Sequence, residues 1–171
     1  DQLRRRHKAR RQGRAHKRSW SIPNMTLIDQ RPSEVATRLV PGHWEGDLII
    51  GKGNLSQVGT LVERTSLYVA LVKLPDGRAE TVAKRFGTIL KRFKRQLRLS
   101  MTYDQGSEMS QHKTLAKDAN INVYFAHPHS PWERGIGENT NGLLRQYLPK
   151  GTDLSLFSQQ QLDDIAWEIN T

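Results

Sequence analysis

Residues 44–50 read WEGDLII, and this short stretch decides how the rest of the chain is interpreted. Leu48, Ile49 and Ile50 form an apolar run typical of a buried strand, and a Gly-Lys-Gly sequence at 51–53 closes it. Asp47 stands at the start of that run, although aspartate is depleted in strands and costly to remove from water. A carboxylate in this place needs a partner, and the sequence leaves open a salt bridge or a metal ion.

The apolar pattern downstream predicts an α/β fold. Residues 58–63 and 68–72 form two further strands, and the short links between them favour an antiparallel meander. Over 82–93, apolar residues recur at three- and four-residue spacings, which predicts an amphipathic helix. The remaining elements are expected in the order strand, helix, strand, helix, helix, at 97–103, 113–119, 121–125, 138–147 and 159–169.

The helical segment at 82–95 determines where the fourth strand can lie. A helical crossover allows a strand to return parallel beside an earlier one. We therefore expect a five-stranded sheet in which the first three strands are antiparallel. The strand that carries Asp47 and the strand that ends at Asp104 should be neighbours.

The net charge of +10 is concentrated at the N-terminus. The first 20 residues hold nine Lys or Arg and one acid, whereas residues 21–171 hold 18 basic and 16 acidic residues. A basic run without apolar periodicity is typical of a disordered segment that contacts nucleic acid, although a solvated linker is the alternative. The residues predicted to contact DNA in this tail are Arg4, Arg5, Arg6, Lys8, Arg10 and Arg11.

Prolines at 23, 32 and 41 mark residues 21–41 as an irregular lead-in, with one short helical turn at 33–38 that Ser33 would cap. We therefore divide the chain into a basic, largely disordered tail and lead-in at 1–41 and a folded core at 42–171. The sequence starts at Asp1 without a methionine and stops just after a helical pattern, so we expect a fragment of a longer protein.

The composition excludes several classes of protein. The absence of cysteine excludes disulfides and cysteine-based zinc sites, and it fits a reducing cytoplasm. No apolar run approaches the roughly 18 residues that a membrane span needs, and no apolar stretch follows the basic N-terminus as in a secretory signal. We expect a cytoplasmic protein.

Three carboxylates occupy positions suited to chemistry: Asp47 in the first strand, Asp104 at the end of the fourth, and Glu138 near the start of a helix. Taken alone, Asp104 could be a turn former and Glu138 could match the positive end of its helix. Together they supply hard oxygen ligands, which select Mg²⁺ or Mn²⁺ over zinc. Two such ions can clamp the attacking and leaving oxygens of a phosphoryl displacement. Without metal, mutual repulsion should raise at least one pKa of the three carboxyls.

Four stretches resemble a known family: GHWEGDLI at 42–49, YDQGSE at 103–108, SPWERG at 130–135 and ENTNGLLRQYLPKG at 138–151. Together they resemble the bacterial insertion-sequence transposases of the IS-thirty family, and the resemblance covers roughly residues 30–170. The last two stretches are the most specific, because they agree over many positions that are not apolar.

The resemblance implies a retroviral-integrase-type catalytic core with the RNase H-like fold at 42–171, truncated at its C-terminal end. The activity implied is metal-dependent DNA cleavage and strand transfer that moves an insertion sequence, with DNA ends and target DNA as partners and a homo-oligomer assembled on DNA. The family's two aspartates and glutamate match Asp47, Asp104 and Glu138, as catalytic residues and as ligands of Mg²⁺ or Mn²⁺. The last two lie 34 positions apart, as the resemblance leads one to expect. Such a protein would act at the nucleoid.

The sequence also departs from the family pattern. A small residue or an acid is expected at His127, and glutamine is usual at Glu133. Neither position is a predicted metal ligand, so these changes bear on DNA contacts. The helix-turn-helix region with which the family reads the element ends has no counterpart in this sequence.

Other residues are weaker candidates. Asn141 and Arg145 share a helical face with Glu138 and could contact a DNA phosphate, or they could belong to an ordinary helix surface. Trp132 is expected to anchor its loop on the core, with base stacking as the alternative. Glu45 and Glu108 lie near the proposed ligands, but we expect neither to bind metal.

Two other functions remain open on the sequence. Another RNase H-like nuclease would share the fold and the metal site. An inactive DNA-binding remnant of a transposase would use only the basic tail. The three acids argue against the remnant, because carboxylates repel DNA phosphates unless metal lies between them.

Overall fold

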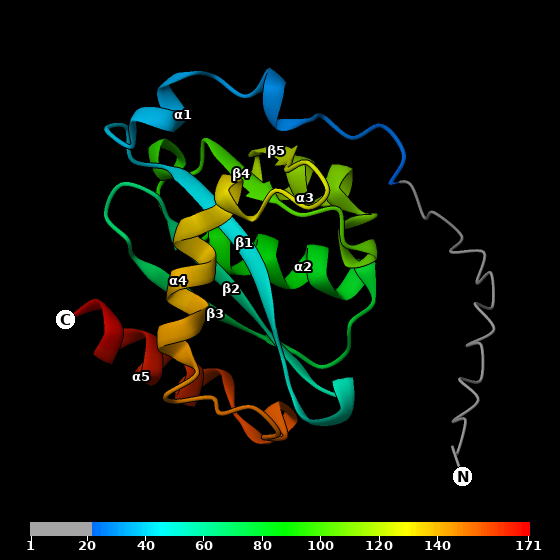
Figure 1. The fold of residues 1–171 in the computed structure, drawn as a ribbon, viewed down its shortest axis with the longest axis vertical. Helices are drawn as coiled ribbons and strands as arrows, with labels where there is room; N and C mark the ends of the chain where they lie inside the picture. Colours follow the sequence, from blue (N-terminus) through cyan, green and yellow to red (C-terminus); the bar gives the residue numbers. More distant parts are fainter. Residues whose placement is uncertain (1–21) are drawn as a thin grey trace, which may run out of the picture.

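The computed structural model describes residues 22–171, which form one five-stranded sheet with helices against both faces (Figure 1). The strands are His43–Ile50 (β1), Gln57–Glu63 (β2), Val69–Leu74 (β3), Ser100–Tyr103 (β4) and Asn122–Phe125 (β5). The helices are Glu34–Thr37 (α1), Ala79–Leu90 (α2), His112–Ala119 (α3), Gly135–Leu144 (α4) and Gln159–Asn170 (α5). Short 3-10 turns are Ile28–Gln30 (η1), Lys52–Asn54 (η2), Arg95–Leu97 (η3), Ser107–Met109 (η4), Pro131–Arg134 (η5) and Leu154–Leu156 (η6).

The strands lie in the order β3-β2-β1-β4-β5. β1, β2 and β3 pair antiparallel, whereas β4 is parallel to β1 and β5 is parallel to β4. The predicted mixed sheet is therefore confirmed, including the placement of the strand that ends before Asp104 beside the strand that carries Asp47. α2 makes the crossover that returns the chain to the other end of the sheet, so that β4 runs in the same direction as β3 and β1.

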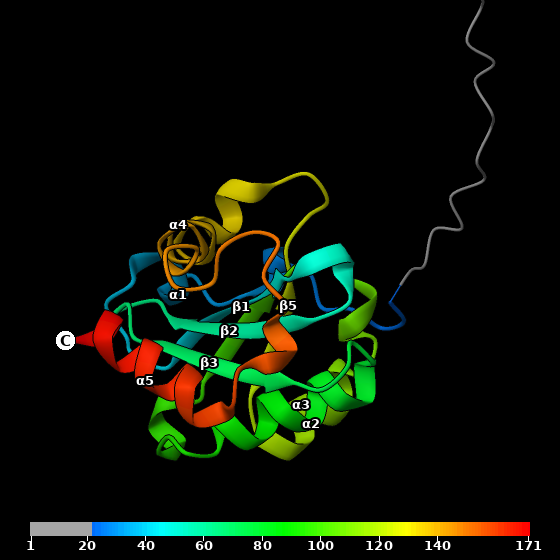
Figure 2. The ribbon, with the colours of Figure 1, turned by 90° about the horizontal axis from the view of Figure 1, so that it is seen from below.

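Helices form a layer on each side of the sheet. Figure 2 shows α4 on one side and α2 and α3 on the other, while α5 lies along β3. Side chains alternate along β3 between the two sides: Val69 and Leu71 belong to the buried cluster with Leu144 of α4, and Val72 belongs to the cluster with Phe86 of α2. The sheet thus has two separate apolar interfaces, and α4 lies on one of them.

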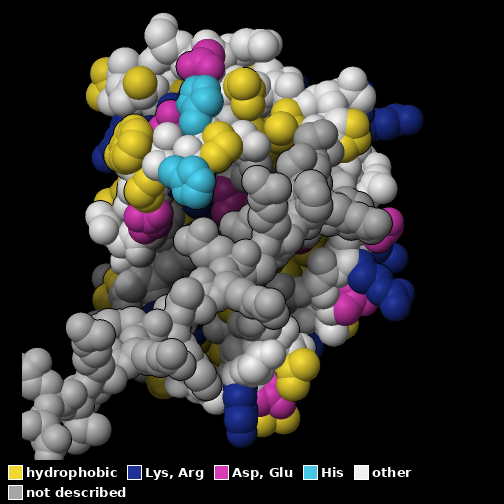
Figure 3. All heavy atoms as spheres, turned by 45° about the vertical axis from the view of Figure 1, so that its right-hand side comes forward, with side chains coloured by type: hydrophobic (Ala, Val, Ile, Leu, Met, Phe, Trp, Pro, Cys, Tyr) yellow, Lys and Arg dark blue, Asp and Glu magenta, His cyan; other side chains and the backbone are white. Residues whose placement is uncertain are grey.

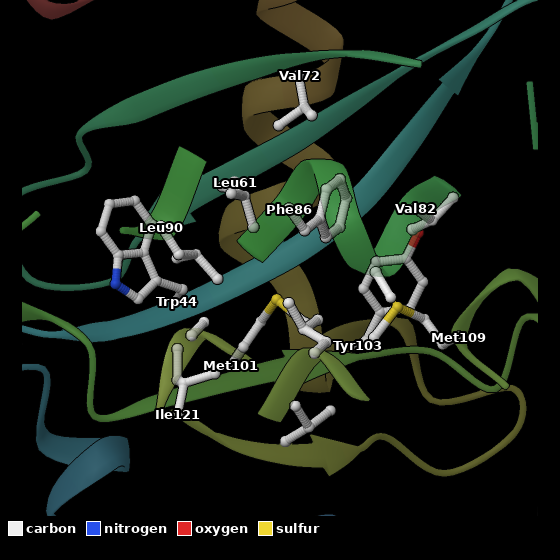
Figure 4. Packing of buried hydrophobic residues seen from close by; sticks show 14 of the residues in the cluster. Trp44, Leu61, Val72, Val82, Phe86, Leu90, Met101, Tyr103, Met109 and Ile121 are labelled. Carbon is white, nitrogen blue, oxygen red and sulfur yellow. The ribbon is translucent and has the colours of Figure 1, made fainter. Parts of the chain in front are cut away.

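The larger cluster lies between the sheet and α2 (Figure 4). Phe86 is fully buried there, and an added Cβ at Gly59 of β2 would overlap its ring. α2 ends at Leu90, before the predicted end at 93. Phe93 leaves the helix and packs on Trp44, with ring centroids 4.8 Å apart. The other predicted elements are present with small shifts of their ends.

The lead-in packs on the sheet, so the folded region begins before the predicted boundary at residue 42. Ile22 and Val35 are buried, and the amide of Phe125 donates to the carbonyl of Thr26 at 2.9 Å. α1 matches the predicted helical turn, but the side chain of Ser33 makes no capping hydrogen bond. The lead-in has no helical periodicity, and its few apolar residues are buried because they pack against the neighbouring folded core. Within residues 22–171, no helix has the length and apolar character needed to cross a membrane.

Candidate active site

Asp47 is held on the face of β1 that α4 covers. Residues 45, 47 and 49 share this face because side chains alternate along a strand. Glu45 and Ile49 are buried, whereas 24% of the Asp47 side chain is exposed. Its Oδ1 accepts from the amide of Leu48 at 2.8 Å, and its Oδ2 accepts from the side-chain amide of Asn141 in α4 at 2.9 Å. The carboxylate therefore has a fixed orientation at the boundary between core and solvent.

Asp104 directly follows β4. The parallel register pairs Glu45 with Thr102, so two further residues along both strands bring Asp104 beside Asp47. Oδ1 of Asp104 accepts from the amide of Gly106 at 3.0 Å, which fixes the turn after the strand. The side chain is 43% exposed. The sheet topology alone therefore explains why two aspartates 57 positions apart are neighbours.

Glu138 lies in the first turn of α4, and its side chain is exposed. Together with Asp104 and Arg134 it lines an open cleft of about 450 Å³, whose remaining wall is formed by residues 105–106 and 127–131. The negative charges of Asp104 and Glu138 both act on Asp47. The structure thus places Asp47 beside Asp104, and it places Glu138 in the cleft that Asp104 lines.

Arg134 connects two of these carboxylates, a contact that the sequence analysis missed. Its Nη1 lies 3.6 Å from Oδ1 of Asp47, and its Nη2 lies 3.5 Å from Oδ2 of Asp104. Only 13% of the side chain is exposed. No sequence pattern pointed to this contact, because Arg134 lies in η5, before the first residue of α4, and its partners belong to other elements.

The pKa of Asp47 is raised above its ordinary value, chiefly because the carboxyl is buried. The hydrogen bond from Leu48 and the charge of Arg134 lower this pKa, and the charges of Asp104 and Glu138 raise it further. The expected rise is confirmed in direction, but repulsion among the three acids is a smaller cause than burial.

The types of donor atom, rather than their present spacing, suit a hard divalent cation. Within residues 22–171, no three His, Cys, Asp or Glu side chains lie as close together as the ligands of one ion do. A guanidinium instead bridges Asp47 and Asp104, which shows that this position accommodates positive charge. Carboxylate oxygens suit Mg²⁺ or Mn²⁺ better than softer metals.

Asn141 and Arg145 have different surroundings on α4. Asn141 donates to Asp47 and is therefore beside the site. The guanidinium of Arg145 donates to the carbonyls of Ile50 at 3.1 Å and Leu148 at 3.3 Å. Arg145 thus links α4 to the end of β1, and its place in the structure is that of a packing residue.

Glu45 and Glu108 bond to protein groups. Glu45 is buried in an ion pair with Arg64, and it also accepts from the amide of Gly137 at 2.7 Å. Glu108 accepts from the hydroxyl of Tyr103 at 3.3 Å, and burial is the largest cause that raises its pKa. The prediction that neither binds metal stays a prediction.

The two departures from the family pattern contact each other. Nδ1 of His127 lies 3.0 Å from Oε1 of Glu133, and Nε2 lies 2.9 Å from Oδ2 of Asp29 in the lead-in. The Glu133 hydrogen bond is the largest cause that raises the pKa of His127. Histidine and acidic side chains lie together on the face shown in Figure 3. The pair connects η5 to the lead-in at the rim of the cleft.

Trp132 does not anchor its loop on the core, so that prediction is wrong. Its side chain is 76% exposed, in the η5 turn that leads into α4. The sequence suggested an anchor because a large apolar ring usually finds a packing partner. Here the neighbouring residues that make the turn, Pro131 and Arg134, line the cleft instead.

The predicted DNA contacts of the tail, from Arg4 to Arg11, lie outside the described residues.

Comparison with known proteins identifies relatives. The profile of the integrase core domain family matches residues 38–131. The transposase for insertion sequence element IS1086 of Cupriavidus metallidurans is 56% identical over 153 residues, which cover 90% of this chain and 45% of that protein. Transposase InsI for insertion sequence element IS30A of Escherichia coli is 40% identical over 173 residues, covering 98% of this chain and 45% of that protein. The chain spans about half the length of the curated relatives it matches.

Solved structures show the same fold. A chain of the simian T-cell lymphotropic virus intasome superimposes with a TM-score of 0.58 at 20% identity, over 77% of this chain and 49% of that chain. The catalytic core domain of BIV integrase superimposes with a TM-score of 0.52 at 18% identity, over 73% of this chain and 80% of that chain. The predicted RNase H-like, integrase-type fold is confirmed.

Proposed function

Because the chain belongs to the integrase core domain family, and to the transposases of the IS-thirty (IS30) type within it, we propose that it is the catalytic core of a transposase. The reaction is cleavage of DNA at the ends of an insertion sequence and transfer of the ends to a target strand. The observation that supports the proposal is the bridge from Arg134 to Asp47 and Asp104, at 3.6 and 3.5 Å, with Glu138 lining the same cleft as Arg134 and Asp104.

Asp47, Asp104 and Glu138 are the groups that would hold the metal. Mg²⁺ or Mn²⁺, as one or two ions, supplies activation of the attacking hydroxyl and stabilisation of the leaving oxygen. Asp47 contributes a carboxylate that Asn141 and the Leu48 amide keep in one orientation. Arg134 neutralises Asp47 and Asp104 while no ion is bound, so the site stays assembled between reactions.

DNA is the proposed partner, and a homo-oligomer on DNA is proposed because two element ends must be joined in one event. The cytoplasm is the proposed location, at the nucleoid when the protein is bound. Glu138 and Asp104 line an open cleft, which gives an extended strand access to the carboxylates. Trp132 stands exposed in the η5 turn beside that cleft and presents a face on which a base can stack.

The test of this function uses the full-length protein with DNA that carries an element end. In Mn²⁺ we expect cut strands and then products in which the end is joined to a target. Cutting without joining would favour another RNase H-like nuclease. Binding without any metal-dependent cutting would favour the inactive remnant and would contradict the proposal.

The basic tail is expected to add affinity that does not depend on DNA sequence. Deleting residues 1–20 removes nine basic residues, and if half of them reach phosphates the log–log salt dependence of binding should flatten by about 4, at roughly 0.9 per phosphate. Binding isotherms at several salt concentrations measure this slope. An unchanged slope after deletion would show that the tail is only a linker.

A further inference from the structure

The first turn of α4 is tied to the centre of the sheet by a buried carboxylate. Glu45 of β1 is 2% exposed and Arg64 is 6% exposed, so their ion pair is shielded from water. One carboxylate oxygen of Glu45 binds Arg64, and the other accepts from the amide of Gly137 at 2.7 Å. Both oxygens are therefore committed, one to each partner.

Gly137 is the residue directly before Glu138. Amides in the first turn of a helix have no partner within the helix, and a carboxylate there also matches the positive end of the helix dipole. A Cβ at position 137 would lie 3.3 Å from Oε2 of Glu45, so a glycine allows the helix to come this close.

The contacts between β1 and α4 follow one register. Gly137 meets Glu45, Asn141 meets Asp47, and Leu144 shares a buried cluster with Ile49. The spacing is two residues on the strand and three to four on the helix, which matches the side-chain periods of the two elements. The Glu45 contact is the one at the end where Glu138 projects.

We propose that Glu45 is a positioning residue that holds the first turn of α4 on β1, so that Glu138 stays beside Asp47 and Asp104. The effect on activity rests on the proposed function, in which Glu138 is a metal ligand. Glu45 acts through its two protein partners, the Arg64 guanidinium and the Gly137 amide. Residues of this kind typically change metal affinity or activity by roughly 10- to 100-fold when replaced.

Two independent changes test the contact from either side. Glu45→Gln removes the charge but keeps the volume, and its matched control is Glu63→Gln. Glu63 is 4% exposed and lies close to Glu45 in the sheet, opposite Trp44, but its hydrogen bonds go to Gly42, Thr65 and Ser66 and none reaches α4. Gly137→Ala leaves both charges in place, and its matched control is Gly142→Ala, where an added Cβ on the same helix meets nothing within 4 Å.

The first readout is amide hydrogen exchange of the metal-free protein, measured well below its melting temperature. We expect exchange in the first turn of α4 to become at least about 10-fold faster in Glu45→Gln and Gly137→Ala, and to be unchanged in both controls. A merely structural role would speed exchange across the whole sheet, in Glu45→Gln and Glu63→Gln alike, and that result would overturn the proposal.

The second readout is the Mn²⁺ concentration that gives half-maximal DNA cleavage by the full-length protein. We expect it to rise about 10-fold or more in the two test variants, with the rate restored at high Mn²⁺, and to stay unchanged in the controls. Unchanged Mn²⁺ dependence in both test variants would contradict the positioning role. If the wild-type protein shows no Mn²⁺-dependent cleavage, the proposed function fails, while the exchange comparison still decides whether Glu45 holds α4.

Discussion

Replacement of Asp47, Asp104 or Glu138 by the matching amide is expected to slow DNA cleavage and joining by at least about 1000-fold. An amide provides one neutral oxygen where the carboxylate provides two charged ones, so the affinity for a hard cation falls. Metal stabilisation of the transition state is worth several kcal/mol, and about 4 kcal/mol corresponds to this factor. Rates of strand cutting by full-length Asp47→Asn, Asp104→Asn and Glu138→Gln, at saturating Mn²⁺, measure the effect.

The control for these variants is an acid on the opposite face of the sheet. Glu80 is exposed in α2, and Glu80→Gln should cut DNA at the wild-type rate. DNA binding through the tail should survive in all four proteins. If the three active-site variants cut DNA as fast as Glu80→Gln, the mechanism proposed for this site is wrong.

Loss of activity in Asp47→Asn should not reflect unfolding. The folded pKa of Asp47 lies above its ordinary value of 3.8, so the folded state binds this proton more tightly than the unfolded state does. Stability from this group is therefore present at low pH and is lost as pH rises from 3.8 through the raised value. At neutral pH without metal, Asp47→Asn should melt no earlier than the wild type, because the amide avoids a buried charge.

The second large effect is expected in the core. Phe86→Ala should lower the free energy of unfolding by about 3–5 kcal/mol, a large share of the roughly 5–15 kcal/mol that holds a domain folded. The ring of Phe86 is fully buried between α2 and the sheet (Figure 4). It packs directly on Gly59, which has no side chain that could move into the cavity left by the Ala variant.

Leu55→Ala is the matched control for Phe86→Ala, because Leu55 is 91% exposed. This exposed site should change stability by no more than about 0.5 kcal/mol. Denaturant-induced unfolding of both proteins measures the difference. A loss below about 1 kcal/mol in Phe86→Ala would mean that α2 does not pack on the sheet through this ring.

Local pattern was sufficient for most of the fold. The apolar runs around Asp47 and Asp104 and the stripe on α2 each depend on residues close in sequence, and they predicted the strands, the crossover and the sheet order. The end of α2 was placed too late because Phe93 continues the apolar spacing, although its partner is Trp44 in β1. The packing of the lead-in was missed because Ile22 and Thr26 make their contacts with distant residues.

The site was predictable only in part for the same reason. Resemblance to a family identified the three carboxylates, and topology explains their proximity. The bridge made by Arg134 and the buried pair of Glu45 and Arg64 join residues from separate elements, and a single sequence carries no signal of such a contact. The contact of His127 with Glu133 was equally hidden, although both had been noted as departures.

The most direct test of the carboxylate site is a crystal structure of this chain grown in Mn²⁺, with anomalous scattering used to locate the metal. We predict at least one peak about 2.0–2.3 Å from oxygens of both Asp47 and Asp104, with Glu138 turned toward it and the Arg134 guanidinium displaced from between the two aspartates. Millimolar Mn²⁺ with no anomalous peak there, and Arg134 still bridging Asp47 and Asp104, would contradict the metal site and the transposase mechanism that depends on it.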